Sequence, residues 1–188
     1  GPRKPPPRLP TKGKRRGKGC ALALKAVLTP STAGSIVEMG SDGSVNVLSS
    51  TVEMGQGSDT ILCQIAAEEM SVSLEKVKIV RPDTDVTPYD TLTAGSRSTF
   101  HMGRAVQLAT NDLKQQFIEI ASDALEVSKE QLEYHEGVVR VKGIPNRNMN
   151  QEEIFAHKFK HAKGTTLVGQ GVFQTSVSPT DKETGQSE

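Results

Sequence analysis

The sequence lacks tryptophan and is poor in aromatic residues, which make up 4% of its 188 positions. A hydrophobic core must therefore be built from aliphatic side chains and methionine, and a chain of this length can bury a substantial one. No apolar run approaches the roughly 20 residues that a membrane-spanning helix needs, and the first residues show no signal-peptide pattern. We therefore expect one domain, or two small ones, without a membrane span.

Cysteine is also scarce, since Cys20 and Cys63 are the only two and no C-x-x-C motif occurs. This excludes a disulfide-rich secreted domain and indicates a reducing, cytoplasmic location. Cys63 falls inside a predicted helix, where we expect it to be buried. The first residue is Gly1 rather than methionine, so we expect the chain to be a processed product or a piece of a longer protein.

Acidic residues are absent from positions 1–18, which instead hold eight Lys or Arg residues and a Pro-rich run. Because the whole chain has 23 basic and 22 acidic residues, the remaining positions carry 15 basic residues against 22 acidic ones. A basic, Pro-rich segment buries little apolar area, so this tail is predicted to be extended or mobile. It is either a contact for nucleic-acid phosphates or a solvated connector, and the acidic body favours the connector.

Hydrophobic patterns predict strands and helices in irregular alternation along the rest of the chain. One apolar stripe, at spacings of three and four from Val106 to Ala124, is typical of a long amphipathic helix. Two further helices are predicted over 58–70 and 150–159. Strands are predicted over 20–29, 35–40, 44–52, 73–80 and 165–174, with a turn over 30–34 and a hairpin over 131–143 that turns at Glu136-Gly137. This order indicates an α+β fold with mixed or antiparallel sheets and packed helices.

A glycine-bearing loop, "MGQG" at positions 54–57, follows an apolar run and precedes a predicted helix. It lacks the third glycine of a dinucleotide fingerprint and the G-K-[ST] of a P-loop. Gly55 and Gly57 leave backbone N–H groups unshielded at a helix N-terminus, where the helix dipole favours an anion. The Gln56 amide can both donate and accept. The pattern predicts an anion or cofactor contact, and the alternative is a plain strand-to-helix turn.

A second loop, "TAGSRS" at positions 93–98, precedes the long helix. Hydroxyls are offered by Thr93, Ser96, Ser98 and the following Thr99. Gly95 opens the backbone, and Arg97 is expected to bring a planar positive charge to the surface. One hydroxyl residue would be enough for a helix cap, and this loop has several together with an arginine. We therefore predict a second anion-binding surface here.

Three other groups of residues are weaker candidates. His157 and His161 have the helical spacing of zinc ligands, but no third ligand stands near them, so a solvated helix face is the better interpretation. Asp83, Asp85 and Asp90 lack the glycine and terminal glutamate of a calcium loop, and we interpret them as turn and capping residues. No Ser-His-Asp or Cys-His arrangement is evident.

The ordered run "EMGQG", "QIAAEE", "DTDVTPYD" and "GSRST" between Glu53 and Thr99 resembles a known family. The chain resembles the molybdenum-cofactor-binding large subunit of the xanthine dehydrogenase and aldehyde oxidase family, which includes carbon monoxide dehydrogenases and other bacterial molybdenum hydroxylases. The resemblance runs from about Arg15 to near the C-terminus. It implies that residues 19–188 form part of a molybdenum-cofactor-binding domain, behind the basic tail of residues 1–18.

The resemblance also assigns the two loops to a cofactor, which is molybdopterin or its cytosine dinucleotide form carrying molybdenum. It implies that Gln56 lies beside the molybdenum and hydrogen-bonds one of the metal's oxygen ligands. The flanking residues of the same loop are Met54, Gly55 and Gly57. The second loop would contact pterin and phosphate oxygens, and it comprises Thr93, Ala94, Gly95, Ser96, Arg97 and Ser98. The "GSRS" form resembles members that use the cytosine dinucleotide.

Other parts of such an enzyme are missing from this chain. The family's catalytic glutamate lies downstream of these motifs, so no residue here is assigned as catalytic, and the resemblance gives Glu53 no such role. Iron–sulfur and FAD centres would belong to partner domains or subunits. We therefore expect the chain to be a fragment of an enzyme that hydroxylates an aldehyde, a purine or another N-heterocycle. The fragment alone is expected to be inactive. The alternative is a non-catalytic interaction module whose basic tail contacts nucleic acid or an acidic partner.

Overall fold

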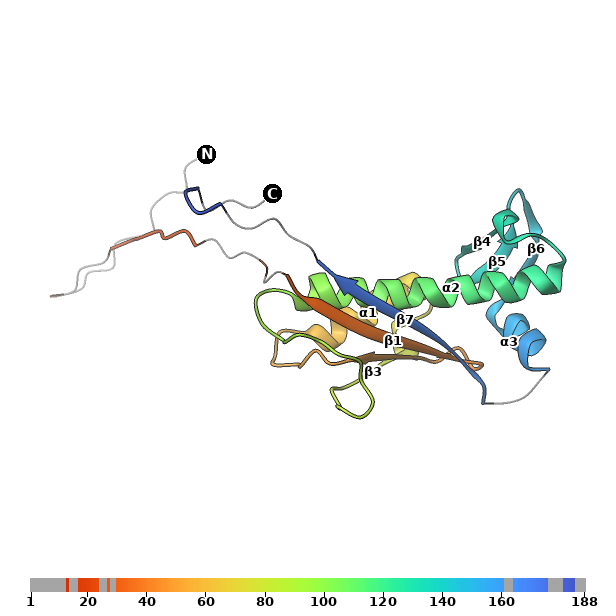
Figure 1. Cartoon of the computed structure of the whole chain (residues 1–188), viewed down its shortest axis with the longest axis horizontal. Coiled ribbons are helices and arrows are strands. Elements are labelled where there is room, and N and C mark those ends of the chain that lie inside the picture. Colours follow the sequence, from red (N-terminus) through yellow and green to blue (C-terminus); the bar gives the residue numbers. More distant parts are fainter. Residues whose placement is uncertain are drawn as a thin grey trace.

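A computed structural model describes residues 13, 17–23, 27, 30–160, 164–175 and 181–184. A main sheet carries two helices, and a smaller sheet with a third helix lies at the far end of the longest helix, α2 (Figure 1). The strands are β1 (Thr32–Gly40), β2 (Val45–Ser49), β3 (Val77–Val80), β4 (Leu132–His135), β5 (Val138–Val141), β6 (Ile144–Asn150) and β7 (Thr166–Gln174). The helices are α1 (Ser58–Met70), α2 (Gly103–Leu125) and α3 (Gln151–Phe159), with short turns η1 (Leu74–Lys76), η2 (Ser98–Met102) and η3 (Lys129–Gln131).

The main sheet has the strand order β3-β2-β1-β7. β1 pairs antiparallel with both β2 and β7, whereas β2 and β3 run parallel and are joined through α1. A parallel pair needs such a crossover, and a helix is its usual form. The prediction of an α+β fold with mixed sheets is therefore confirmed.

The apolar stripe of α2 forms the centre of the core, as its spacing predicted. Its buried side chains include Val106, Ala109, Leu113, Phe117 and Ile120. They pack on β1 and β7, with α1 beside them. The two glycines of β7 let α2 approach closely, because a Cβ at Gly169 or Gly171 would lie 2.1 or 2.2 Å from a carbonyl oxygen of α2.

The smaller sheet, β4-β5-β6, is antiparallel throughout. Its first turn is at Glu136-Gly137, as predicted, and both residues have positive φ, 48° and 80°. Tyr134 of β4 donates a hydrogen bond of 2.7 Å to the carbonyl oxygen of Met70, the last residue of α1. The small sheet is therefore attached to the ends of both long helices.

Two of the predictions were wrong at the start of the first strand. Residues 20–23 were expected in a strand but form none, and residues 24–26, 28 and 29 of that stretch lie outside the described residues. The expected turn over 30–34 is instead the beginning of β1, because Thr32 to Gly34 pair with β7 about 140 positions later. Of the basic tail, only residues 13, 17 and 18 are described. None of the helices in the described residues is long and apolar enough to cross a membrane.

Candidate functional site

The first predicted loop connects β2 to α1, as expected. Gly55 and Gly57 both have left-handed backbone conformations, with φ of 94° and 81°, which residues with a Cβ rarely adopt. Gly57 is also the N-cap of α1 and provides no side-chain cap. The loop shape therefore requires both glycines.

The N–H groups of the two loop glycines are not free, which corrects the expectation drawn from these glycines. The N–H groups of Gly55 and Gly57 donate to Oε1 of Glu53, at 2.7 and 3.0 Å. Oε2 of Glu53 accepts from the N–H of Asp59 at 3.1 Å and from the hydroxyl of Ser58 at 3.2 Å. These donors, led by the Asp59 and Gly57 N–H groups, lower the pKa of Glu53 to about 2. The chain's own carboxylate thus fills the anion position at the N-terminus of α1.

Gln56 lies at the exposed tip of the loop, but its amide is held by neighbours. Its Nε2 donates to the carbonyl oxygen of Val52 at 2.7 Å and to Oγ of Ser58 at 3.0 Å. Its Oε1 accepts from the N–H of Met54 at 2.5 Å. The Met54 side chain is two-thirds exposed, at 67%. The amide orientation is therefore defined. Both hydrogens of Nε2 are donated within the protein, so the group left for a ligand at this exposed tip is the second lone pair of Oε1.

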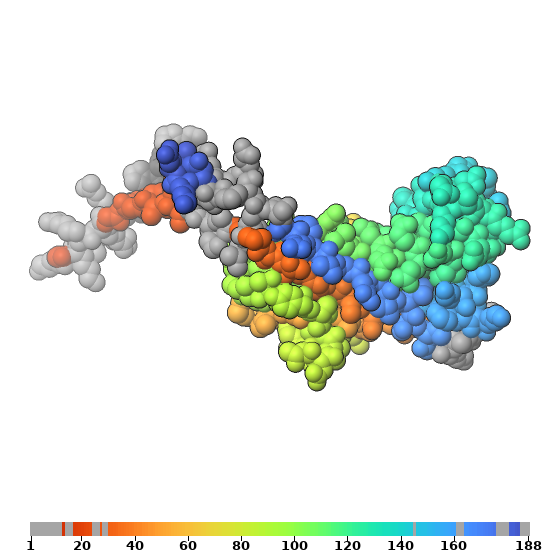
Figure 2. Space-filling model, viewed as in Figure 1, coloured from red at the N-terminus to blue at the C-terminus, as the bar shows by residue number. Residues whose placement is uncertain are grey.

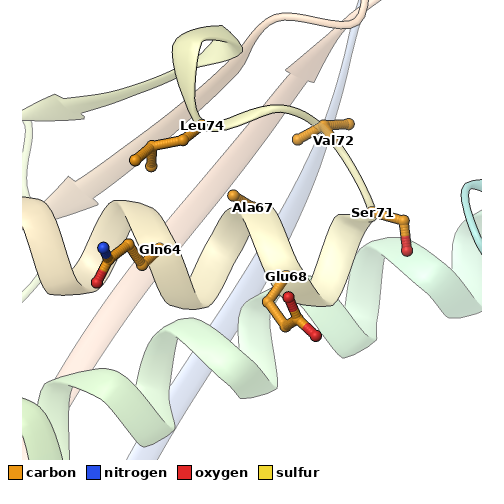
Figure 3. Close-up of a pocket in the computed structure, with 6 residues that line it drawn as sticks. All are labelled: Gln64, Ala67, Glu68, Ser71, Val72 and Leu74. Atoms are coloured by element: carbon orange, nitrogen blue, oxygen red, sulfur yellow. The ribbon is translucent and has the colours of Figure 1, made fainter.

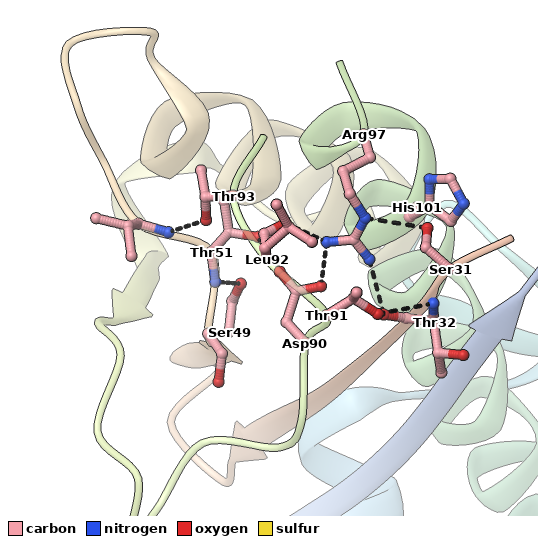
Figure 4. Close-up of polar contacts among 12 residues, drawn as sticks. Ser31, Thr32, Ser49, Thr51, Asp90, Thr91, Leu92, Thr93, Arg97 and His101 are labelled. Carbon is pink, nitrogen blue, oxygen red and sulfur yellow. Dashed lines mark hydrogen bonds and ion pairs between the residues drawn. The ribbon is translucent and has the colours of Figure 1, made fainter. Parts of the chain in front are cut away.

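The second loop is tied to the first. Oγ1 of Thr93 accepts a 2.8 Å hydrogen bond from the N–H of Val52, so the two loops meet although they lie about 40 positions apart (Figure 4). Gly95 and Ser96 have successive positive φ values of 66° and 61°. The structure thus brings the Gln56 loop and the 93–98 loop together.

Donors of the second loop do remain available. Within the described part of the chain, the hydroxyls of Ser96, Ser98 and Thr99 have no hydrogen-bond partner. Ala94 is exposed beside them. The segment that carries this loop, between β3 and α2, projects from the body of the molecule (yellow-green in Figure 2). An anionic ligand would therefore find free donors here rather than at the start of α1.

Arg97 does not have the expected position. Its side chain is 1% exposed and is directed into the protein, where Nη1 contacts Oδ1 of Asp90 at 2.5 Å (Figure 4). Nη2 donates to the carbonyl oxygen of Thr32 at 2.7 Å, Nε donates to Oγ of Ser31 at 3.1 Å, and Nη1 also donates to the carbonyl oxygen of Leu92. The guanidinium fixes the base of the loop to the start of β1. Asp90 is correspondingly an ion-pair partner rather than the turn residue that we expected.

His101, in η2, was not singled out from the sequence. Its ring is fully buried, with Nε2 3.0 Å from Oγ1 of Thr175, and Nδ1 has no hydrogen-bond partner among the described residues. Burial lowers the pKa of His101, and the nearby positive charge of Arg97 adds to this. The imidazole packs edge-on against Phe100 and near Phe173. His101 is therefore a neutral core histidine below the second loop.

An apolar hollow lies beside the second loop. It measures about 630 Å³ and is lined mainly by Ile65, Phe100 and Phe173, with Ser96 and Thr99 at its polar side. Phe100 is 51% exposed. An exposed aromatic side chain next to unsatisfied hydroxyls is typical of a surface that another molecule or segment covers.

The other candidates do not form a site. A hollow of about 550 Å³ between the end of α1 and η1 is lined by the exposed side chains Gln64, Glu68 and Ser71 and lies away from both loops (Figure 3). His157 is exposed on α3, and His161 lies outside the described residues. No group of histidine, cysteine or acidic residues in the described ranges could hold a metal ion.

The remaining sequence interpretations are largely as expected. Cys63 is buried, and burial raises the pKa of its thiol. Asp83 is a turn residue, since Oδ1 accepts from the N–H of Asp85 at 2.9 Å. The N-terminus of α3 is closed by reciprocal hydrogen bonds between Asn150 and Glu153.

Comparison with known proteins identifies a family. The profile of the molybdopterin cofactor-binding domain matches residues 3–188. The chain is 31% identical over 150 residues to the putative xanthine dehydrogenase molybdenum-binding subunit of Escherichia coli K12, covering 78% of this chain and 20% of that protein. It is 36% identical over 112 residues to the carbon monoxide dehydrogenase large chain of Afipia carboxidovorans, covering 60% of this chain and 14% of that protein.

Solved structures agree with this result. Reconstituted CO dehydrogenase from Oligotropha carboxidovorans superimposes with a TM-score of 0.68 at 28% identity, over 76% of this chain and 18% of that chain. Quinoline 2-oxidoreductase from Pseudomonas putida 86 gives 0.62 at 27% identity, over 79% of this chain and 20% of that chain. The chain thus spans about a fifth of the length of these relatives.

Proposed function

The chain belongs to the molybdopterin cofactor-binding domain family of the molybdenum hydroxylases, and from this we propose that it forms one wall of the cofactor site of such an enzyme. Gln56 would lie beside the metal, with Met54, Gly55 and Gly57 shaping its loop. The second loop would hold the pterin and its phosphate through backbone N–H groups and hydroxyls. Its members are Thr93, Ala94, Gly95, Ser96, Arg97 and Ser98.

The observation that carries this proposal is the link between the two loops. The Val52–Thr93 hydrogen bond places the Gln56 loop next to a loop whose hydroxyls have no partner among the described residues. A phosphate-bearing cofactor accepts hydrogen bonds through its oxygens, and hydroxyl and amide donors suit it. Ser96 and Ser98 therefore fit the group. Arg97 would act through the shape of the loop, because its guanidinium is already bound to Asp90.

The activity of the whole enzyme is part of the proposal. When bound, the cofactor would supply the oxidation chemistry for hydroxylating an aldehyde, a purine or another N-heterocycle, with electrons passing to Fe–S and FAD centres on partner domains or subunits. Relatives named as a xanthine dehydrogenase subunit and a nicotine 6-hydroxylase support a purine or another N-heterocycle as the substrate. The "GSRS" loop supports the cytosine dinucleotide form of the cofactor. The free cysteines Cys20 and Cys63 support a cytoplasmic location.

The chain alone is proposed to be inactive. A buried cofactor needs contacts over most of its surface, and this chain offers an open face with one group of free donors. No residue in it is proposed as catalytic. The alternative function, an interaction module with a nucleic-acid-binding tail, has no observation in its favour among the described residues.

The decisive test is metal and pterin analysis of the full-length protein that contains this chain. Elemental analysis should find about one molybdenum per full-length subunit, together with a pterin and oxidation of an aldehyde or N-heterocycle. The isolated 188-residue chain should contain no stoichiometric molybdenum. A full-length protein without molybdenum would overturn the proposed function, and a fully loaded isolated chain would overturn its proposed dependence on further segments.

A further inference from the structure

We propose that Glu53 is a positioning residue of the Gln56 loop: its carboxylate takes the place of the missing helix cap and, through Ser58, supports the orientation of the Gln56 amide. The loop geometry alone supports this positioning role. Its importance for a cofactor rests on the proposed function. Neither the sequence pattern nor the family resemblance assigns a role to Glu53.

The first argument is the number of donors on one carboxylate. Three backbone N–H groups, those of Gly55, Gly57 and Asp59, converge on the two oxygens of Glu53, and the Ser58 hydroxyl is the fourth donor. A helix N-terminus leaves such N–H groups unsatisfied unless a side chain accepts them. A glycine N-cap cannot do so, and Gly57 is that residue here. Glu53, four positions earlier, supplies the cap.

The second argument is a continuous chain of hydrogen bonds to the functional amide. Nε2 of Gln56 donates to Oγ of Ser58 at 3.0 Å, and the Ser58 hydroxyl donates to Oε2 of Glu53 at 3.2 Å. Ser58 is 3% exposed, so the hydroxyl that joins the two bonds is buried although Gln56 lies at the surface. Because the Ser58 hydroxyl has one hydrogen, donating it to Glu53 leaves its oxygen to accept from Gln56. The carboxylate therefore orients the Ser58 hydroxyl to accept from Gln56, and this bond acts together with the Val52 and Met54 contacts in fixing the amide.

Two consequences follow for the site. Glu53 is a poor general base, because its oxygens are occupied by donors that favour the ionised form. In addition, the Gly57 and Asp59 N–H groups at the N-terminus of α1 already bind a carboxylate, so an external anion would have to displace Glu53 to use them. The hydroxyls of the 93–98 loop require no such displacement.

The test uses the 188-residue chain and NMR of its amides. In the unaltered chain, the amide protons of Gly55, Gly57 and Asp59 should be shifted downfield and protected from exchange. Glu53→Ala should accelerate their exchange about ten- to a hundredfold, as expected when a hydrogen bond to a charged group is lost. Glu68→Ala, which removes an exposed glutamate from the C-terminal part of α1, is the matched control and should leave these amides unchanged.

Addition of a small carboxylate makes the test specific. Formate should restore the protection of these amides in Glu53→Ala, because it can occupy the vacated position, and should have no effect on the unaltered chain. Inorganic phosphate should shift the Gly57 and Asp59 amides only in Glu53→Ala. Unchanged exchange in this variant, or phosphate binding to these amides in the unaltered chain, would overturn the proposal.

A milder variant separates positioning from simple stability. Glu53→Gln keeps the side-chain size but has one accepting oxygen, so it should preserve the fold and the melting temperature within a few degrees. It should nevertheless shift the side-chain amide signals of Gln56. Unmoved Gln56 signals would contradict the relay through Ser58. If these signals move but the full-length protein contains no molybdenum, the positioning role stands and the proposed function fails.

Discussion

Arg97 and Asp90 form a buried ion pair, with 2.5 Å between Nη1 and Oδ1 and side-chain exposures of 1% and 2%. The pair lies beneath the 93–98 loop and connects it to the first residues of β1 through Ser31 and Thr32. The 93–98 loop was predicted to present the positive charge of Arg97 at the surface. The Arg97 side chain instead points into the protein and pairs with Asp90. The available donors of the loop are hydroxyls.

The ion pair predicts a large effect of removing one partner. Arg97→Met should lower the free energy of unfolding by about 3–5 kcal/mol, because it leaves the Asp90 carboxylate buried without a partner. Urea denaturation measures this. Arg81→Met removes an exposed partner of Asp59 and should cost less than about 1 kcal/mol. Equal effects of the two substitutions would show that the Arg97 pair is not an interior one.

Substitution of Gln56 is expected to lower activity without affecting the fold. Its side chain is exposed and bonds only within its own loop. In the full-length enzyme, Gln56→Ala should lower turnover roughly ten- to a hundredfold, as for loss of a hydrogen bond worth about 1.5–3 kcal/mol. Gln64→Ala, on the exposed face of α1, should leave turnover unchanged. Normal turnover of Gln56→Ala at full molybdenum content would refute the assigned role.

A side chain at Gly171 is expected to clash with α2 where this helix packs on β7. A Cβ there would lie 2.2 Å from the carbonyl oxygen of Ala105 and 2.4 Å from the backbone nitrogen of Ala109, and neither atom can rotate away. Gly171→Ala should therefore destabilise the fold by about 1–3 kcal/mol or more. Gly19→Ala, with nothing within 4 Å of its Cβ, is the control. Unchanged urea midpoints for both variants would mean that α2 does not pack this closely on β7.

Because of His101, we expect the folded chain to lose stability on mild acidification. The pKa of His101 is lowered below the ordinary 6.5 in the folded state, so the unfolded chain binds the proton first as the pH falls. The neutral ring's contribution is present above about pH 6.5 and is lost as the pH falls below that value. The charged groups near it are Arg97 and Asp90.

The measurement is the melting temperature between about pH 7.5 and 5.5. His101→Gln should be less stable at the higher pH and should lose less on acidification than the unaltered chain. The exposed His157→Gln should behave like the unaltered chain. An identical pH dependence in all three proteins would exclude His101 as the titrating group.

Glu53 is expected to cause a second loss of stability on acidification, at much lower pH than His101. Its pKa is lowered from 4.5 to about 2 by the loop N–H groups, so its contribution is present above about pH 4.5 and is lost as the pH falls towards 2. The carboxyl carbon of Glu53 should still report the ionised form near pH 3.3, where a glutamate with the ordinary pKa of about 4.3 is mostly protonated. Titration of the Glu53 carboxyl group near that ordinary value, in a carbon-detected NMR series, would contradict the four-donor arrangement.

The sequence alone was sufficient wherever a structure depends on near neighbours. The stripe from Val106 to Ala124 repeats with the helical period, and α2 forms there because one face can be buried. The turn at Glu136-Gly137 and the loop between β2 and α1 follow from glycines that accept positive φ. The family resemblance depended on the same local motifs, and it was confirmed by the match over residues 3–188.

Tertiary structure decided the features whose partners are distant in the chain. Thr32 to Gly34 have turn-like composition but form a strand because β7 supplies the hydrogen bonds, and the polar segment Ile144–Asn150 becomes β6 by pairing with β5. The Arg97 side chain points inward because the fold brings its partners Asp90, Ser31 and Thr32 to one place. Side-chain type shows that a residue can donate, accept or carry charge. Which partner it meets, and whether water still reaches it, is determined only when the chain has folded.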